Sequence, residues 1–267
     1  LDIFSNEENF IKKIRKPFKI LRLFTENKNL FEKRKKHNFK VYLINRYKQL
    51  LKLKYKKPEL AISYGFSLIF NKKIISEYKK GIWNIHPGDL PKYRGRHPIT
   101  VAFLKNEKKI GVSVHSIDHR IDRGHLLAKK FVKRTYKDDE NTIKKKILKE
   151  IPNLLNKSLQ NYIANKTKKL SKGKYYEPFY NGIKLNVPKK YNKIYIYNAI
   201  KAQKSYGGIL INGERFTDVK FYHKKYLKNK SFKILVCKGS KKLVVKKWKV
   251  NVQLCNHTFY LGQVILI

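Results

Sequence analysis

Histidine and aspartate gather in one stretch of the chain. Five of the eight histidines and three of the seven aspartates lie between residues 86 and 125. Glycine and proline interrupt this stretch just after His86, and a second loop contains Arg123-Gly124. Loops that leave strands often carry function, and imidazoles beside carboxylates are suited to moving protons. In a chain with only 18 acidic residues, this grouping indicates an active site.

Three of these residues have types and spacing suited to acyl transfer. Asn84 and His86 are two residues apart, so on a strand both side chains leave the same face. We expect Asp122, at the exit of a neighbouring strand, to hold the imidazole tautomer and stabilise its charged form. The Asn84 amide would then donate to an oxygen that gains negative charge in a tetrahedral intermediate. Because no Ser or Cys stands in an activated context, we expect direct attack by an amine substrate.

Several nearby residues have simpler interpretations. Asp89 is predicted to be a turn residue, since aspartate often bonds to neighbouring backbone. His115 and His119 lack a third ligand at zinc-like spacing, so no metal site is expected. Arg94 and His97 are candidate substrate-binding residues of the acceptor pocket, with loop packing as the alternative.

The elements that must position these residues follow from hydrophobic periodicity. Short apolar runs alternate with amphipathic stretches, which predicts strands over 1–4, 18–24, 39–44, 60–64, 81–86 and 111–117 and helices over 6–14, 30–37, 47–54, 98–104 and 138–165. This alternation predicts an α/β fold, a Rossmann-like, mostly parallel open sheet with helices on both faces. Ligands of such sheets bind at the carboxyl ends of strands, near a switch in strand order.

The pattern changes in the last third of the chain. Strand-like runs over 208–222, 232–237, 243–252 and 259–267 are separated by turns at Asn212-Gly213 and Gly239-Ser240. They predict a small C-terminal antiparallel β domain, plausibly a barrel. We expect a catalytic domain over residues 1–170, a basic linker over 171–190 and the β domain over 191–267.

Composition limits the partners and the compartment. The 267 residues include 64 Lys and Arg against 18 Asp and Glu, a formal net charge of +46, which fits either a polyanionic partner or a solvated basic surface. No apolar run approaches the length of a membrane span, so no membrane partner is expected.

Two cysteines and no signal-peptide pattern favour a reducing compartment, the cytoplasm or an organellar matrix. The absence of methionine indicates a fragment or a processed chain.

A longer series of residues carries a family resemblance, which is strongest over residues 60–129. It resembles the formyltransferases that use 10-formyltetrahydrofolate, a family that includes methionyl-tRNA formyltransferase and sugar-nucleotide N-formyltransferases. The matching residues are Asn84-Ile85-His86-Pro87-Gly88-Asp89-Leu90-Pro91-Lys92-Tyr93-Arg94-Gly95, Pro98-Ile99, Gly111-Val112 and Asp122-Arg123-Gly124.

The resemblance implies roles for particular residues. Asn84, His86 and Asp122 match the family's catalytic set, and the step from Asn84 to Asp122 fits its spacing. The folate donor would lie against the loop after the fourth strand and near Asp118; the loop residues are Ser63, Tyr64, Gly65, Phe66, Ser67 and Leu68. Residues 191–202 would form a helix, although their Ile and Tyr content favours a strand.

The acceptor of the formyl group stays open at this point. Net charge and the expected β domain favour methionyl-tRNA by a narrow margin. However, the tRNA enzymes of the family carry a long basic insertion after the second strand, and residues 24–28 leave no room for it. This departure favours an amino-sugar nucleotide, which is the alternative; weighed together, the features still favour methionyl-tRNA narrowly. A catalytically silent RNA-binding relative is a further alternative, opposed by the intact Asn84, His86 and Asp122 set.

Overall fold

The structure, a computed structural model, describes residues 1–247 apart from 16–17, 54–55, 180, 225 and 227–230. By its contacts the chain divides into two compact units. Unit 1 comprises Leu1–Gly95, Gly111–Val132 and Lys145–Tyr175, and unit 2 comprises Arg96–Ile110, Lys133–Lys144 and Tyr176–Ile267. The expected strand over 259–267 lies outside the described residues.

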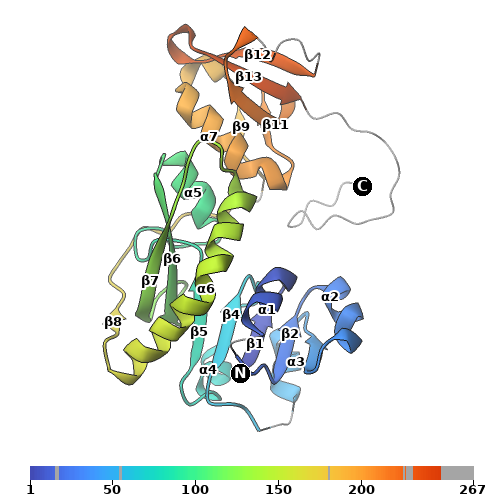
Figure 1. The fold of residues 1–267 in the computed structure, drawn as a ribbon, viewed down its shortest axis with the longest axis vertical. Helices are drawn as coiled ribbons and strands as arrows, with labels where there is room; N and C mark the ends of the chain where they lie inside the picture. Colours follow the sequence, from blue (N-terminus) through green and yellow to red (C-terminus); the bar gives the residue numbers. More distant parts are fainter. Residues whose placement is uncertain (16–17, 54–55, 180, 225, 227–230, 248–267) are drawn as a thin grey trace. The chain divides into compact units, whose positions relative to one another are not determined.

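Unit 1 is built on an eight-stranded sheet with the order β3-β2-β1-β4-β5-β6-β7-β8, which Figure 1 shows with its flanking helices. Strands β1 to β5 are parallel, β6 runs antiparallel to β5, and β8 runs antiparallel to β7. The strands are β1 (Asp2–Ser5), β2 (Arg22–Thr25), β3 (Lys40–Leu43), β4 (Ala61–Tyr64), β5 (Ile82–His86), β6 (Lys109–Ser116), β7 (His125–Lys133) and β8 (Lys168–Lys169).

The helical segments up to residue 163 are α1 (Glu8–Ile14), α2 (Lys28–Glu32) with the 3₁₀ turn η1 (Lys33–Lys36), α3 (Tyr47–Lys52), α4 (Lys72–Ser76), α5 (Pro98–Leu104) and α6 (Glu140–Ile163). Phe10, Ile11 and Ile14 recur at helical spacing in α1 and are all buried. Asn27 caps α2 by accepting a hydrogen bond from the Leu30 backbone N–H at 3.2 Å. The predicted α/β fold, with a mostly parallel sheet, is therefore confirmed.

Three elements of this sheet region escaped the sequence pattern, one of them the two-residue strand β8. Strand β7 was not predicted, because lysines interrupt its apolar residues and its exposure alternates irregularly along the strand. The short helix α4 was also missed; its N-cap Asn71 accepts from the Ile74 backbone N–H, and Ile74 is its only buried residue.

Unit 2 contains a second, smaller sheet with the order β12-β13-β11-β10-β9. Its pairs are antiparallel except for β9 with β10. The strands are β9 (Lys184–Leu185), β10 (Ile209–Ile211), β11 (Glu214–Phe221), β12 (Phe232–Val236) and β13 (Lys242–Lys247); the helical segments are η2 (Pro188–Lys190), α7 (Lys193–Gln203), η3 (Lys204–Tyr206) and η5 (Lys238–Ser240).

Helix α7 confirms the helix implied for residues 191–202. Ile196, Ala199 and Ile200 are fully buried in the core of unit 2, against residues of the small sheet such as Phe216 and Leu243. This tertiary burial overrides the strand propensity of the segment. Unit 2 also takes in α5, which packs on α7, so an element from the middle of the chain joins the C-terminal sheet.

Gly111 sets the spacing between β6 and the loop that follows β5. A Cβ at Gly111 would lie 2.7 Å from the Asp89 Cα and 2.9 Å from its backbone nitrogen. Because backbone cannot move aside as a flexible side chain does, Gly111→Ala should lower the free energy of unfolding by about 1–3 kcal/mol. Urea denaturation measures this loss, with Lys109→Ala on the exposed start of β6 as the control. Equal stability of the two variants would contradict this close packing.

His97 links three segments of unit 2. Its Nδ1 accepts a hydrogen bond from the Phe179 backbone N–H at 2.9 Å, and its ring lies 6.1 Å from those of Phe179 and Tyr206. Burial, followed by the charges of Arg96 and Lys144, lowers the pKa of His97 from 6.5 to about 4. The folded protein therefore takes up this proton at lower pH than the unfolded chain does.

This pKa predicts an acid-dependent loss of stability. The free energy of unfolding should fall as pH drops from about 6.5 towards 4, because the unfolded state gains the proton first. His97→Asn keeps an acceptor for the Phe179 N–H but does not titrate. Between neutral pH and about pH 5 the variant should lose about 1 kcal/mol less than the native chain, after allowance for solvent screening. Parallel pH–stability curves from urea denaturation would contradict this.

Candidate active site

The site lies where β5 and β6 meet the loop that leads into β7. Asn84 and His86 occupy β5, and β5 pairs with β6 so that Asn84 faces His115 and His86 faces Ser113. On the other side, Asn84 is the register partner of Ser63 in β4. Asn84 therefore stands between Ser63 and His115 on one face of the sheet, as the period of two along each strand requires.

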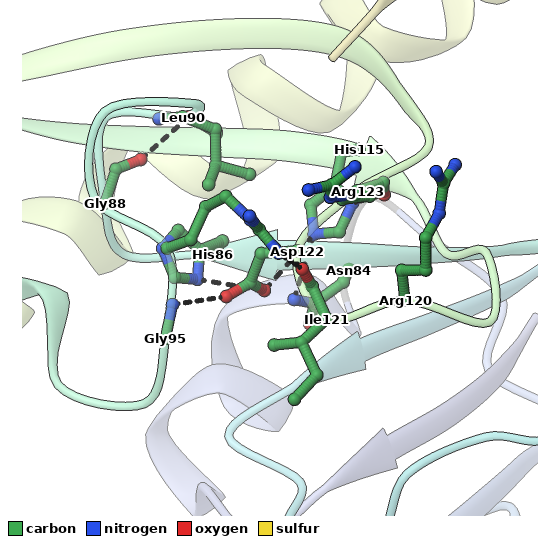
Figure 2. Close-up of polar contacts among 12 residues, drawn as sticks. Asn84, His86, Gly88, Leu90, Gly95, His115, Arg120, Ile121, Asp122 and Arg123 are labelled. Atoms are coloured by element: carbon green, nitrogen blue, oxygen red, sulfur yellow. Dashed lines mark hydrogen bonds and ion pairs between the residues drawn. The ribbon is translucent and has the colours of Figure 1, made fainter. Parts of the chain in front are cut away.

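The structure brings Asp122 to His86. The Asp122 Oδ1 lies 3.5 Å from the His86 Nδ1 and 3.8 Å from the His115 Nε2, and Figure 2 shows the carboxylate between the two rings. His86 and His115 are 4% and 2% exposed, so these polar groups interact with little solvent between them. The three residues predicted to act together thus lie in one cluster, together with His115.

The tautomer of His86 is set by backbone rather than by Asp122. The His86 Nε2 lies 2.7 Å from the Tyr93 carbonyl oxygen. A carbonyl oxygen can only accept, so Nε2 carries the hydrogen and donates it. This leaves Nδ1, which faces Asp122, as the ring nitrogen without a hydrogen in the neutral ring.

A short loop holds both members of this pair. The Gly95 backbone N–H donates to the Asp122 Oδ2 at 2.7 Å, two residues after the carbonyl that binds His86. Between them, Arg94 donates from Nε and Nη2 to the Ile121 carbonyl at 3.2 and 2.7 Å, and from Nη1 to the Gly173 carbonyl at 3.2 Å. The guanidinium of Arg94 thus fastens the residue before Asp122.

The loop after β6 turns sharply enough to direct Asp122 back over the sheet. Asp122 has a φ of 50°, in the left-handed region that aspartate tolerates better than most residues. A Cβ at Gly124 would lie 2.1 Å from the Ser116 carbonyl oxygen, so only glycine fits this close approach. The Asp122–Gly124 part of the motif is explained by this turn.

Ser113 and Lys129 anchor the segment that follows His86. The Ser113 hydroxyl donates to the Gly88 carbonyl at 2.7 Å and accepts from the Leu90 backbone N–H at 3.2 Å. Lys129 forms an ion pair with Asp89 and also donates to the Leu90 carbonyl. Asp89 is thus engaged by Lys129 of β7.

Residues 63–68 comprise the end of β4 and the start of the loop after it, at the point where the strand order reverses. Strands β2 and β3 lie to one side of β1, and β4 and β5 to the other; open α/β sheets bind ligands beyond the strand ends at such a reversal. Gly65 has a φ of 59° and its Cβ position lies 2.9 Å from the Glu7 side chain. The Ser67 backbone N–H donates to Glu26 at 2.8 Å, and Phe66 stacks on Phe70.

The remaining predicted site residues have separate surroundings. The Asp118 carboxylate binds Arg120: it accepts hydrogen bonds from the Arg120 backbone N–H and from its guanidinium, both at 2.7 Å. Partial burial acts to raise the pKa of Asp118, but the hydrogen bonds and charge of Arg120 lower it overall. His97 lies in unit 2 with the contacts given above.

His115 is the residue of the cluster that the sequence did not single out for this chemistry. His115 lies opposite Asn84 because β6 runs antiparallel to β5. The sequence pattern does not reveal the direction of β6, so this position could not be predicted. Within the described residues, no group of three or more His, Cys, Asp or Glu side chains is placed to hold a metal ion. No helix among them is long and apolar enough to span a membrane.

Curated proteins with similar sequences include two kinds of enzyme. The chain is 32% identical over 134 residues to the bifunctional polymyxin resistance protein ArnA of Wigglesworthia glossinidia brevipalpis, covering 49% of this chain and 20% of that protein. It is 33% identical over 116 residues to methionyl-tRNA formyltransferase of Borreliella burgdorferi, covering 43% of this chain and 35% of that protein. The chain thus matches about a third or less of the length of either relative.

Solved structures share the fold along nearly the whole chain. A sugar 3N-formyl transferase, determined in the presence of dTDP and 5-N-formyl-THF, has a TM-score of 0.66 and 20% identity, with 92% of this chain and 96% of that chain covered. An N-formyltransferase from Helicobacter canadensis, in complex with folinic acid and dTDP-3-aminofucose, has a TM-score of 0.67 and 20% identity, with 92% and 98% covered.

The sequence profile of the formyl transferase family matches residues 19–159, which is more than half of the chain. That segment runs from just before β2 into α6 and contains Asn84, His86, His115 and Asp122. This chain belongs to the formyl transferase family.

Proposed function

We propose that the chain is an N-formyltransferase that moves the formyl group of 10-formyltetrahydrofolate to a primary amine. The observation that carries this proposal is the buried cluster of Asn84, His86 and Asp122, with His86 Nδ1 left as the proton acceptor. An amine that attacks a formyl carbon must lose a proton, and the carbonyl oxygen gains negative charge as it does so.

His86 and Asn84 have complementary tasks in this reaction. The amine nitrogen bonds to the formyl carbon, the His86 Nδ1 takes the proton that the amine releases, and the carbon–nitrogen bond to the folate then breaks. His86 returns the proton to the departing folate nitrogen, so the reaction is balanced without any other reagent. An amide N–H of Asn84 stabilises the oxyanion of the tetrahedral intermediate.

Asp122 supports the charged state of His86 during this cycle. Its Oδ1 is 3.5 Å from the Nδ1 that receives the proton, so its negative charge stabilises the imidazolium that forms. The Tyr93 carbonyl keeps accepting from Nε2 in both protonation states, so the ring does not have to rotate between steps.

The folate donor is assigned to the carboxyl ends of β1 and β4. Open α/β sheets bind ligands at such a reversal of strand order, and loop 63–68 leads from there towards β5. Ser63 is the register partner of Asn84, which supports a donor site reaching from Ser63, Tyr64, Gly65, Phe66, Ser67 and Leu68 to the catalytic cluster, with Asp118 on the opposite loop. Backbone N–H and C=O groups near Gly65 suit the paired donors and acceptors of a pterin.

For the acceptor we favour an amino-sugar nucleotide. Strand β2 ends at Thr25 and α2 begins at Lys28, so the connection has no room for the long basic insertion of the tRNA enzymes. The sugar N-formyltransferase structures match the fold of this chain over almost their entire length, which supports an acceptor of that class. Arg94 and His97 stay candidates for shaping the acceptor pocket.

Methionyl-tRNA is the second candidate, favoured by two observations. The net charge of +46 suits a polyanionic partner, and methionyl-tRNA formyltransferases are among the sequence relatives. An RNA acceptor would bind with an affinity that falls steeply as salt rises, whereas a single sugar nucleotide would show a much weaker dependence.

His86→Ala tests the proposed base directly. Removing the proton acceptor should lower kcat by about 10²- to 10⁴-fold, since general base catalysis contributes about that much. The control is His119→Ala, an exposed histidine in the same loop as Asp122, which should leave kcat unchanged. Near-native turnover by the His86 variant, with its fold verified by circular dichroism, would refute this role.

A direct comparison of acceptors decides between the two candidates. The protein is incubated with 10-formyltetrahydrofolate and either a panel of amino-sugar nucleotides or methionyl-tRNA, and products are identified by mass spectrometry. We expect formylation of an amino-sugar nucleotide, with little dependence on salt. Formylation of methionyl-tRNA alone would overturn our choice of acceptor, and RNA binding without turnover would support a catalytically silent relative.

A further inference from the structure

His115 lies against the amide of Asn84. The two residues face each other across β5 and β6, and the Asn84 Nδ2 is 3.2 Å from the His115 Nε2. The other ring nitrogen, Nδ1, lies 3.0 Å from the Ser116 carbonyl oxygen and 2.9 Å from the Arg123 carbonyl oxygen. Figure 2 shows the ring of His115 between Asn84 and the loop that carries Arg123.

The two carbonyls determine which ring nitrogen of His115 carries the hydrogen. Carbonyl oxygens can only accept, so Nδ1 is the protonated nitrogen and donates to both of them. In the neutral ring, Nε2 then holds a lone pair and can only accept. The amide of Asn84 must therefore present its NH₂ group, not its oxygen, to His115.

This arrangement requires His115 to stay neutral. Burial is the main cause that lowers the pKa of His115, and the nearby His86 adds to it, while the charge of Asp122 and the two carbonyls oppose it. Its titratable neighbours are Asp122, with Oδ1 3.8 Å from Nε2, and His86 across the strand pair. A protonated Nε2 would be a donor, and it would favour the opposite orientation of the Asn84 amide.

We infer that His115 is a positioning residue, which orients the Asn84 amide so that an N–H group faces the reaction centre. The NH₂ group has two hydrogens: one is bound by the His115 Nε2, and the second is left for the oxyanion of the tetrahedral intermediate. This inference rests on the proposed function, because the orientation matters only if Asn84 donates to that oxyanion.

A double-mutant cycle tests whether His115 acts through Asn84. His115→Phe should lower kcat by about 10- to 100-fold with little change in the KM for the folate donor, because the ring volume is kept but the acceptor is lost. In Asn84→Ala, the added His115→Phe substitution should cause no further loss. Multiplicative losses in the double variant, or full activity of His115→Phe, would overturn the inference.

A conservative variant separates orientation from packing. His115→Gln offers an oxygen near the Nε2 position that can accept from the Asn84 amide, so its kcat should exceed that of His115→Phe. If both variants lose activity equally while both stay folded by circular dichroism, a purely structural role is indicated and the inference fails.

Nitrogen-15 NMR of the histidine rings gives a readout that does not depend on activity. We expect His115 to be neutral, with the hydrogen on Nδ1, in a range around neutral pH. A hydrogen on Nε2, or protonation of the ring in that range, would overturn the inference even in an active enzyme. If no acceptor is formylated by the native chain, the proposed function fails, whereas this spectrum still decides the tautomer of His115.

Discussion

The site depends on one constraint: His86 is bound on its two nitrogens by groups of different kinds. The Tyr93 carbonyl accepts from Nε2 at 2.7 Å, while the Asp122 carboxylate faces Nδ1 at 3.5 Å. A neutral acceptor on one side fixes the tautomer, and a charge on the other side stabilises the imidazolium. Because the ring is 4% exposed, water competes little with either contact.

The rest of the local structure serves to hold these groups in place. The same short loop supplies the Tyr93 carbonyl and the Gly95 N–H that binds Asp122, so His86 and Asp122 share one support. Arg94 ties this loop to Ile121 and to Gly173, where a Cβ would lie 1.7 Å from the Pro91 carbonyl oxygen. Residues remote in sequence thereby fix the distance between the Asp122 carboxylate and the His86 ring.

Much of the fold and of the candidate site could be predicted from the sequence, for definable reasons. The strands of unit 1 are short apolar runs bounded by polar helices, as at β4, where all four residues are buried. The period of two along a strand predicted that Asn84 and His86 lie on the same face of the sheet. The structure brings Asp122 to His86 on that face.

Other features depend on contacts that periodicity does not encode. The register of β6 with β5, which places His115 opposite Asn84, is set by the antiparallel return of the chain. The tautomer of His86 depends on the Tyr93 backbone carbonyl. Every residue has such a carbonyl, so residue type does not predict this contact. Strand β7 was missed because its lysines obscure the apolar residues that pack inward. Helix α5 joins the unit of the small sheet because it packs on α7. This contact joins distant parts of the sequence, so periodicity could not predict it.

The most direct measurement is the protonation of the His86 ring nitrogens, recorded by nitrogen-15 NMR in the neutral state. We predict a hydrogen on Nε2, bound to the Tyr93 carbonyl, and none on Nδ1. A neutral ring with its hydrogen on Nδ1 would leave no proton acceptor beside Asp122, and it would contradict the role proposed for His86.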